Sequence, residues 1–525
     1  MSSILKNTAV VAAFTSLSRV LGLVREMLQS RLIGAGYEQS AFALAFAIPN
    51  MARRMFGEGA LTAAFVPVFK GELEADESLV RAKRLARAVL TMSLMMLGCA
   101  VLVAVLSLTA FLHWPWREAL SPRLALTVDL TRIMLPYMVF ICAAAFGMGV
   151  LNAFGKFAAP AMLPSILNVV WISALAALCL CPGLSTHAKT MSIACAILLA
   201  GLLQMAFMFR MMAKKGIAPR LTRKGWRDGT TRLVWHNMAI ACIGAGAVQI
   251  NYMLDQVLAQ KANPWAAGVI GYADRLMELP LGVVGTAFGT VLLPTFSGFF
   301  AKADIDGAKN AFQSSVRNML FVVLPCAAGL VVLAPELTSL IYKGGAFDDI
   351  AAVRVARAVA CYSLGLAFFC LQKTLTPWFQ AQKDMKTPLT VTVRLVFANA
   401  ALNIASVWLL PVEWRHVGLA ASTVLCAAAA CMWLWILAVR RNGGMGTVGL
   451  AAAVAKMLCS ALAMATVVHI LRGILAERDF AAGAAVAMLV PAGAAVYFAA
   501  EFLFDRQSMR NIVCEFAGRR ARRNR

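Results

Sequence analysis

The stretch IPNMARRMFGEG, from Ile48 to Gly59, places two arginines and a glutamate inside the apolar range 38–70. A helix that spans a bilayer needs about 20 mainly apolar residues. Charged side chains within such spans are rare, and they usually face a helix bundle or a water-filled cavity. The stretch therefore predicts membrane helices that enclose a polar site.

The composition agrees with a membrane protein. Of 525 residues, 61% are hydrophobic and 14% are charged, whereas soluble domains carry about 25% charged residues. The formal net charge of +24 would suggest nucleic acid in a soluble protein. Here basic cytoplasmic loops beside anionic headgroups explain it. No nucleic-acid motif is present, so we predict membrane lipids and no nucleic acid as partners.

Apolar segments predict an all-α polytopic fold of about 14 transmembrane helices. Basic residues gather in the loop 214–230 and in the tail 506–525, which fall on one side of this topology. The positive-inside rule places both termini in the cytoplasm. The predicted helices are 4–33, 38–70, 81–112, 122–152, 160–181, 188–213, 231–261, 266–300, 308–341, 351–381, 388–410, 416–440, 447–473 and 480–504.

A faint internal repeat suggests two lobes. AAFVPVFKGELEAD (63–76) and TVLLPTFSGFFAKAD (290–304) end the second and eighth predicted helices, and both contain Pro, Phe and a final Ala-Asp. Parallel repeats with a site between them are typical of secondary transporters. The predicted domains are an N-lobe (1–213), a basic cytoplasmic loop (214–230), a C-lobe (231–441), two further helices (442–505) and a basic cytoplasmic tail (506–525).

Charged residues within the spans form the candidate site. A single arginine near a helix end can extend to the headgroups, and a lone ion pair can merely lock two helices. Taken together, however, the basic residues outnumber the acidic ones, which suits an anion and above all phosphate, because guanidinium donates paired hydrogen bonds to phosphate oxygens. The candidates are Arg19, Arg25, Arg53, Glu58, Asp274, Arg275, Glu278 and Lys373.

Catalytic motifs are missing from the sequence. There is no Walker A loop, no HExxH and no GxSxG, and the five histidines show no paired spacing. The 13 cysteines lack metal-ligand spacing and are interpreted as apolar filling. We therefore predict no catalytic residues and no cofactor, and we expect an ion gradient or the membrane potential to supply energy. The choice between Na+ and H+ as coupling ion stays open.

Several motifs resemble the MurJ/MviN family, the lipid II flippases of bacterial peptidoglycan synthesis within the MOP exporter superfamily. They are SRVLGLVRE, PNMARRMFGEGALTAAFVPVF, YADRLMELPLGVVGTAFGTVLLP and QKDMKTP. The resemblance implies a MATE-like fold in the bacterial inner membrane, with two six-helix lobes and a central cationic cavity. It also implies that the last two helices, within 442–505, line a groove for the polyprenyl tail.

The resemblance also implies roles for individual residues. Arg19, Arg25, Arg53 and Arg275 match residues that bind the headgroup pyrophosphate, and Glu58, Asp274, Glu278 and Lys373 match further cavity charges. Some relatives carry an aspartate at the position of Ser40 and a lysine at that of Ala47, so a mechanism that needs both charges is in doubt here. A sodium site of some members is similar to the set Asp255, Asn399, Asn403 and Thr423.

The resulting hypothesis is a lipid II flippase that works by alternating access and is driven by membrane potential, an ion gradient or both. Its expected partners are lipid II, membrane lipids and cell-wall synthesis or division proteins. One alternative is an exporter of another polyprenyl-linked oligosaccharide or of drugs. A second is a polyprenyl-phosphate transferase, an enzyme that would need an acidic metal-binding pair or a similar constellation. A third is a scaffold, which would not need charges inside its spans.

Overall fold

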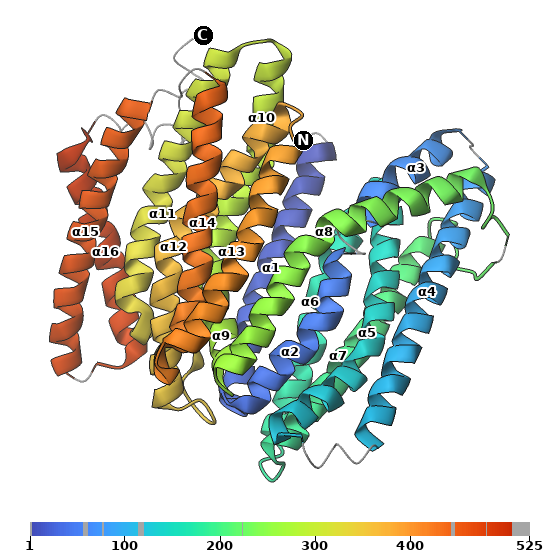
Figure 1. Cartoon of the computed structure of the whole chain (residues 1–525), viewed down its shortest axis with the longest axis horizontal. Helices are drawn as coiled ribbons and strands as arrows, with labels where there is room; N and C mark the ends of the chain where they lie inside the picture. Colours follow the sequence, from blue (N-terminus) through green and yellow to red (C-terminus); the bar gives the residue numbers. More distant parts are fainter. Residues whose placement is uncertain are drawn as a thin grey trace. The chain divides into compact units, whose positions relative to one another are not determined.

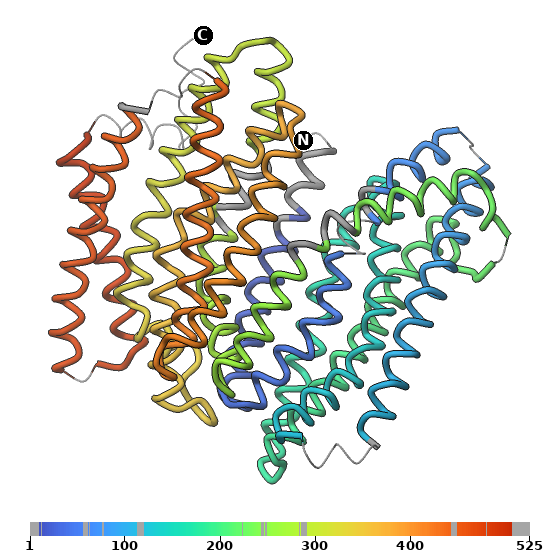
Figure 2. Tube along the Cα trace, viewed as in Figure 1, coloured from blue at the N-terminus to red at the C-terminus, as the bar shows by residue number. Residues whose placement is uncertain are grey.

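The computed structural model describes residues 3–55, 61–75, 78–113, 120–222, 224–442, 447–478 and 480–506 (Figure 1). Figure 2 follows the same chain as a tube along the Cα trace. These residues are predominantly helical (Figure 1). The elements are α1 (Ser3–Ile33), α2 (Tyr37–Ala52), α3 (Leu61–Ala75), α4 (Val80–His113), α5 (Pro122–Ala153), α6 (Ala158–Cys179), α7 (Thr186–Ala213), α8 (Gly229–Ala262), α9 (Ala266–Pro280), the π-helix η3 (Leu281–Gly285), α10 (Thr286–Ala301), α11 (Ile305–Tyr342), α12 (Asp349–Ala381), α13 (Lys386–Leu409), the 3-10 helix η4 (Val412–Trp414), α14 (Arg415–Arg441), α15 (Thr447–Glu477) and α16 (Ala482–Phe504).

Each of the predicted membrane ranges contains helix, so the all-α expectation is confirmed. Among the described residues, 10 helices are long and apolar enough to cross a membrane, namely α4 to α7 and α11 to α16. The predicted ranges 4–33, 38–70, 231–261 and 266–300 are not among them. These same four ranges carry most of the candidate charged residues. Within 38–70 and 266–300 the described α-helices α2, α3, α9 and α10 are each 15 or 16 residues long. The full number of crossings therefore stays a prediction.

Two of these charged ranges, 38–70 and 266–300, each contain a π-helical segment. Residues 53–55 are π-helical and follow α2, which contains Pro49, while η3 directly follows Pro280 of α9. Proline removes one backbone hydrogen bond of a helix, and π-turns within helices are frequent at functional sites. The helix–π-turn pattern recurs where the sequence repeat was found, ahead of α3 and α10. This agrees with the predicted internal repeat.

Contacts divide the chain into two units, Met1–Gly268 with Gly344–Asp348, and Val269–Lys343 with Asp349–Arg525. By this criterion α8 belongs to the first unit, whereas the sequence places the boundary between lobes at the basic loop 214–230. The contact-based division follows packing, because α8 packs against α2, α3 and α4. The assignment of functional lobes stays a prediction.

The first unit is built around α5, which packs against α2, α3, α4 and α7, while α1 packs against α6. The α5–α7 contact depends on a small residue. A Cβ added to Gly201 would lie 2.5 Å from Cδ2 of Tyr137, a ring that is 1% exposed. Interiors are close-packed, so such a contact leaves no room for a side chain. The close packing fixes the framework on which α1 and α6 present their polar residues.

The second unit is built around α11 and α12. The ring of Trp378 on α12 is fully buried and lies edge-on to Phe296 of α10 and Phe312 of α11, at centroid distances of 5.3 and 5.2 Å. Helices α15 and α16 pack against one another and against α11 (Figure 1). An ion pair between Arg472 and Glu336 joins α15 to α11. Because both partners are largely buried, this pair orients the last two helices on α11.

The QKDMKTP segment joins three helix ends of the second unit. Asp384 accepts hydrogen bonds from the hydroxyl of Thr387 at 2.6 Å and from its backbone N–H at 2.9 Å. Arg441, at the end of α14, forms an ion pair with the same carboxylate and donates to the Thr387 hydroxyl at 3.0 Å. The bonds from Thr387, followed by the pair with Arg441, lower the pKa of Asp384 from 3.8 to about 2.

Replacing Asp384 with asparagine is expected to remove a contribution to the free energy of unfolding that is present at neutral pH and lost in acid. The pKa of Asp384 is about 2 in the folded protein and 3.8 as the ordinary value. A lowered folded pKa stabilises the protein above the ordinary pKa, and this contribution is lost as pH falls toward the folded value. The thermal midpoint of D384N in detergent should therefore lie several degrees below the wild type at pH 6. The two midpoints should converge as pH falls from 4 toward 2, and a constant difference would contradict the assignment.

Candidate functional site

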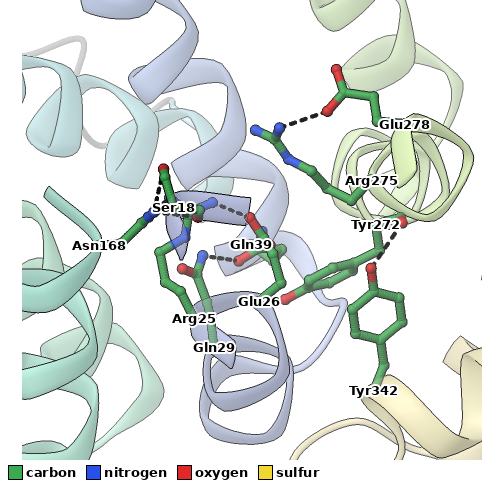
Figure 3. A network of polar contacts seen from close by, with 10 residues as sticks. All are labelled: Ser18, Arg25, Glu26, Gln29, Gln39, Asn168, Tyr272, Arg275, Glu278 and Tyr342. Atoms are coloured by element: carbon green, nitrogen blue, oxygen red, sulfur yellow. Dashed lines mark hydrogen bonds and ion pairs between the residues drawn. The ribbon is translucent and has the colours of Figure 1, made fainter. Parts of the chain in front are cut away.

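Arg25 lies at the centre of a polar cluster between α1 and α6 (Figure 3). Its Nη1 donates to Oδ1 of Asn168 at 3.0 Å, and its Nη2 forms an ion pair with Glu26. The guanidinium carbon lies 4.3 Å from the ring centroid of Trp171. Arg25 is 9% exposed. A buried charge requires this kind of compensation, because leaving it without partners in a medium of low polarity is costly.

The other two predicted arginines of the first unit differ from Arg25 in exposure. Arg19 is exposed on α1, six residues before Arg25. Arg53 is half-buried at the π-helical end of α2, where its Nε donates to Oδ1 of Asn50 at 3.1 Å. Arg54 lies 5.8 Å from the centroid of the Tyr252 ring on α8. Arg25 is thus the least exposed of the three predicted arginines in the first unit.

The second unit holds the charged group of α9. Arg275 is exposed, and its Nη1 lies 2.9 Å from Oε2 of Glu278, which confirms that these two residues share a helix face. Asp274 is half-buried. The helix is anchored beside them, since the Tyr342 hydroxyl of α11 donates to the carbonyl of Tyr272 at 3.1 Å (Figure 3). The hydrogen bond between Tyr342 and Tyr272 therefore holds α9 on α11, while Arg275 remains exposed.

Of two further predicted cavity charges, Lys373 and Glu58, only Lys373 lies within the described residues. Lys373 is half-buried on α12. Glu58 lies outside the described residues, so its predicted role stays a prediction. The roles of all eight candidate charges as headgroup ligands or cavity residues stay predictions.

The predicted sodium ligands are divided between the two units. On α8, Asp255 accepts a hydrogen bond of 3.4 Å from Asn251, within the first unit. On α13, Asn399 and Asn403 are buried and joined by a 3.0 Å hydrogen bond. The Thr423 hydroxyl of α14 donates to the carbonyl of Leu419 at 3.2 Å. These oxygen-bearing groups suit a hard cation chemically, and the sodium site stays a prediction.

Neutral polar residues at the ends of α1, α2 and α8 were not identified from the sequence. Gln29 donates to Gln39 at 2.9 Å, and Gln260 donates to the carbonyl of Ser40 at 2.7 Å. The Ser40 hydroxyl accepts from the backbone N–H of Gly268 at 3.0 Å. In this chain, Ser40 therefore makes neutral hydrogen bonds. Buried amides within apolar helices are the available sequence signal, because they seek partners on neighbouring helices.

The fold is similar to that of known transporters. It matches an inward-facing multidrug resistance MATE transporter of the MOP superfamily with a TM-score of 0.64 and 15% identity, covering 84% of this chain and 99% of that chain. It matches a structure of the lipid II flippase MurJ, in an inward closed conformation, with a TM-score of 0.75 and 21% identity, covering 94% of this chain and 98% of that chain. The chain therefore shares the fold of these two structures.

Relatives in sequence identify the family to which the chain belongs. The model of the family described as "Lipid II flippase MurJ" matches residues 29–490. A probable lipid II flippase MurJ of Rhizobium tropici is 33% identical, over 89% of this chain and 86% of the relative. The lipid II flippase MurJ of Burkholderia cenocepacia is 33% identical, over 82% of this chain and 83% of the relative. The chain therefore belongs to the MurJ family of lipid II flippases, which are multi-pass membrane transporters rather than enzymes.

Proposed function

We propose that this chain moves lipid II from the cytoplasmic to the periplasmic leaflet of the bacterial inner membrane. Membership of the MurJ family over residues 29–490 carries this proposal. The chemistry agrees with it, since the arginines of α1, α2 and α9 suit the pyrophosphate of the headgroup. The polyprenyl tail would stay in the membrane, against α15 and α16.

The proposed mechanism is alternating access across 14 transmembrane helices with both termini in the cytoplasm. The proposed ligands of the headgroup pyrophosphate are Arg19, Arg25, Arg53 and Arg275, of which Arg19 and Arg275 are exposed. A membrane potential that is negative inside favours outward movement of an anion by about 2.3 kcal/mol per charge per 100 mV. A Na+ or H+ gradient is the alternative source of energy for returning the empty transporter.

A drug exporter of the same superfamily is the second candidate function, because the fold also matches a MATE transporter. Multidrug substrates are mostly cationic, and the candidate site has more arginines than carboxylates among its named residues. Like charges repel a cation from such a site. The charge of the site therefore favours an anionic lipid over a cationic drug.

Replacing Arg275 with alanine tests the proposal in cells depleted of their own flippase. We expect Arg275→Ala, and likewise Arg19→Ala, to lose rescue while the protein still reaches the membrane in normal amount. Arg357→Ala is a suitable control in the second unit, since Arg357 lies on the ring of Trp414 at 4.8 Å and is not a candidate site residue. Full rescue by well-expressed Arg19→Ala and Arg275→Ala would contradict the headgroup role.

Transport itself is measured in vesicles that contain lipid II and the purified protein. Translocation of the headgroup is followed with and without an imposed potential, and with and without a sodium gradient. We expect a potential that is negative on the cytoplasmic side to accelerate translocation. A rate that responds only to the sodium gradient would replace the potential by sodium coupling, and no translocation under any condition would contradict the proposed function.

A further inference from the structure

The amide of Asn168 links two groups of α1 that need opposite partners. Its Oδ1 accepts from Nη1 of Arg25 at 3.0 Å, and its Nδ2 donates to the carbonyl of Ser18 at 3.0 Å. An arginine can only donate and a carbonyl can only accept, so the orientation of the amide is determined by its neighbours. A leucine of similar size would satisfy neither group, and an aspartate would lack the donor.

The ring of Trp171 supports the guanidinium of Arg25 from a second side. Trp171 follows Asn168 by three residues, so both side chains lie on one face of α6. The ring is 2% exposed and lies edge-on to Phe42 and Phe46 of α2, each at a centroid distance of 5.5 Å. The rings of α2 therefore fix Trp171, and Trp171 gives the guanidinium a flat surface on which cation–π attraction operates.

Nη1 and Nη2 of the Arg25 guanidinium have different partners. Nη1 is bonded to the neutral amide of Asn168, whereas Nη2 is paired with the carboxylate of Glu26 (Figure 3). An anionic ligand carries charge of the same sign as the Glu26 carboxylate and also accepts hydrogen bonds from a guanidinium, so it can replace this carboxylate at Nη2. It does not need to displace the amide of Asn168 from Nη1. Exchange at Nη2 would therefore leave the bond to Asn168 intact.

We propose that Asn168 is a positioning residue for Arg25, which holds Nη1 so that Nη2 can exchange Glu26 for a phosphate oxygen of a lipid-linked pyrophosphate. This inference rests on the proposed function and adds residues of α6 to the site. Because the guanidinium is held on the Trp171 ring, it is oriented before the ligand arrives, and a pre-oriented group loses less freedom on binding.

The test measures binding of undecaprenyl pyrophosphate to protein in nanodiscs, with undecaprenol as the tail-only control. We expect Asn168→Ala to weaken binding of the pyrophosphate lipid about tenfold, or about 1.4 kcal/mol. Asn168→Asp should weaken it at least as much, because its carboxylate would pair with Arg25 and repel the ligand. Binding of undecaprenol should be unchanged in both variants.

Gln204→Ala provides the matched control for stability. Gln204 is 2% exposed and donates to the carbonyl of Leu163 at 2.8 Å, so it also joins α6 to a neighbouring helix through a buried amide. Its loss should lower the thermal midpoint about as much as Asn168→Ala, without changing affinity for the pyrophosphate lipid. If Asn168→Ala and Asn168→Asp lose only stability and bind as tightly as wild type, the positioning role is overturned.

Arg25→Ala separates this inference from the proposed function. If Arg25→Ala loses binding and the Asn168 variants keep it, only the positioning role fails. If Arg25→Ala binds normally, the assignment of Arg25 to the headgroup fails. The 19F resonance of 5-fluorotryptophan at position 171, assigned with Trp171→Phe, then decides the positioning role independently of ligand. A resonance that shifts in Asn168→Ala supports it, and an unchanged resonance overturns it.

Discussion

Replacing Arg25 with alanine is expected to abolish rescue of cells depleted of their own flippase and to lower the stability of the protein. The substitution removes the cation that faces Glu26 and the donor that satisfies Oδ1 of Asn168. Breaking a buried ion pair by removing one partner costs about 3–5 kcal/mol. Because this is a large part of the total stability of a protein, the amount of protein in the membrane must be measured together with growth.

A double substitution separates the two effects of losing Arg25. Arg25→Ala/Glu26→Ala also removes the carboxylate that loses its Arg25 partner, so the thermal midpoint and the membrane level should recover while rescue stays absent. Arg25→Lys keeps a positive charge, but a compact ammonium group lacks the planar fork of donors that reaches Asn168 and Glu26 and cannot lie flat on the Trp171 ring. It should therefore give partial activity at near-normal abundance.

Arg84→Ala is the matched control for removing an arginine from an ion pair. Arg84 lies 3.0 Å from Asp228, and the two side chains are 58% and 40% exposed. Exposed ion pairs contribute about 0–1 kcal/mol, so this variant should rescue growth like the wild type. Rescue by the double variant Arg25→Ala/Glu26→Ala would show that Arg25 serves stability alone.

The sequence predicted the charged helices better than it predicted their neighbours. Arg25 was recognisable because bilayer hydrocarbon penalises charge within a span. Its position on α1 follows from helical geometry and the motif alone. Its contact with Asn168 joins residues that are 143 positions apart. Spacing along one helix carries no information about such a pair, which depends on how α1 packs on α6.

The irregular helices show a similar limit. The charges within 38–70 and 266–300 indicated unusual spans. They did not indicate π-helical turns, because the number of residues in a turn depends on which carbonyls remain available after proline removes a donor. The basic loop before α8 likewise did not predict that α8 packs within the first unit. The charge of a loop indicates on which side of the membrane it lies, and it carries no information about helix contacts.

Gly34→Ala and Gly345→Ala are expected to be strongly destabilising, because each added methyl group would collide with backbone atoms. The turn Gly344–Asp348 is grouped with the first unit, and its Ala346 N–H donates to the carbonyl of Arg31 at 2.8 Å. A Cβ on Gly34 would lie 2.4 Å from the carbonyl oxygen of Ala346, and a Cβ on Gly345 would lie 2.2 Å from that of Arg31. Both obstacles are backbone atoms, which cannot rotate away as a side chain can.

The backbone conformation adds a second penalty at both positions. Gly34 has a φ of +79° and ends α1, and Gly345 has a φ of +58°. The left-handed conformation costs residues other than glycine roughly 1–2 kcal/mol. Gly155 is a matched control, because its φ is +68° and a Cβ would meet nothing within 4 Å. Gly155→Ala should therefore show the conformational penalty without the collision.

Thermal unfolding in one detergent compares the three variants. Gly155→Ala should lower the midpoint modestly, whereas Gly34→Ala and Gly345→Ala should lose a further amount on the order of 2–3 kcal/mol, as expected for strain that the surroundings cannot relieve. Equal losses in all three would contradict the close backbone contact between the end of α1 and the turn Gly344–Asp348. The contact has a functional consequence, because α1 carries Arg19 and Arg25. A variant that releases the end of α1 should thus weaken pyrophosphate binding through residues that never touch the ligand.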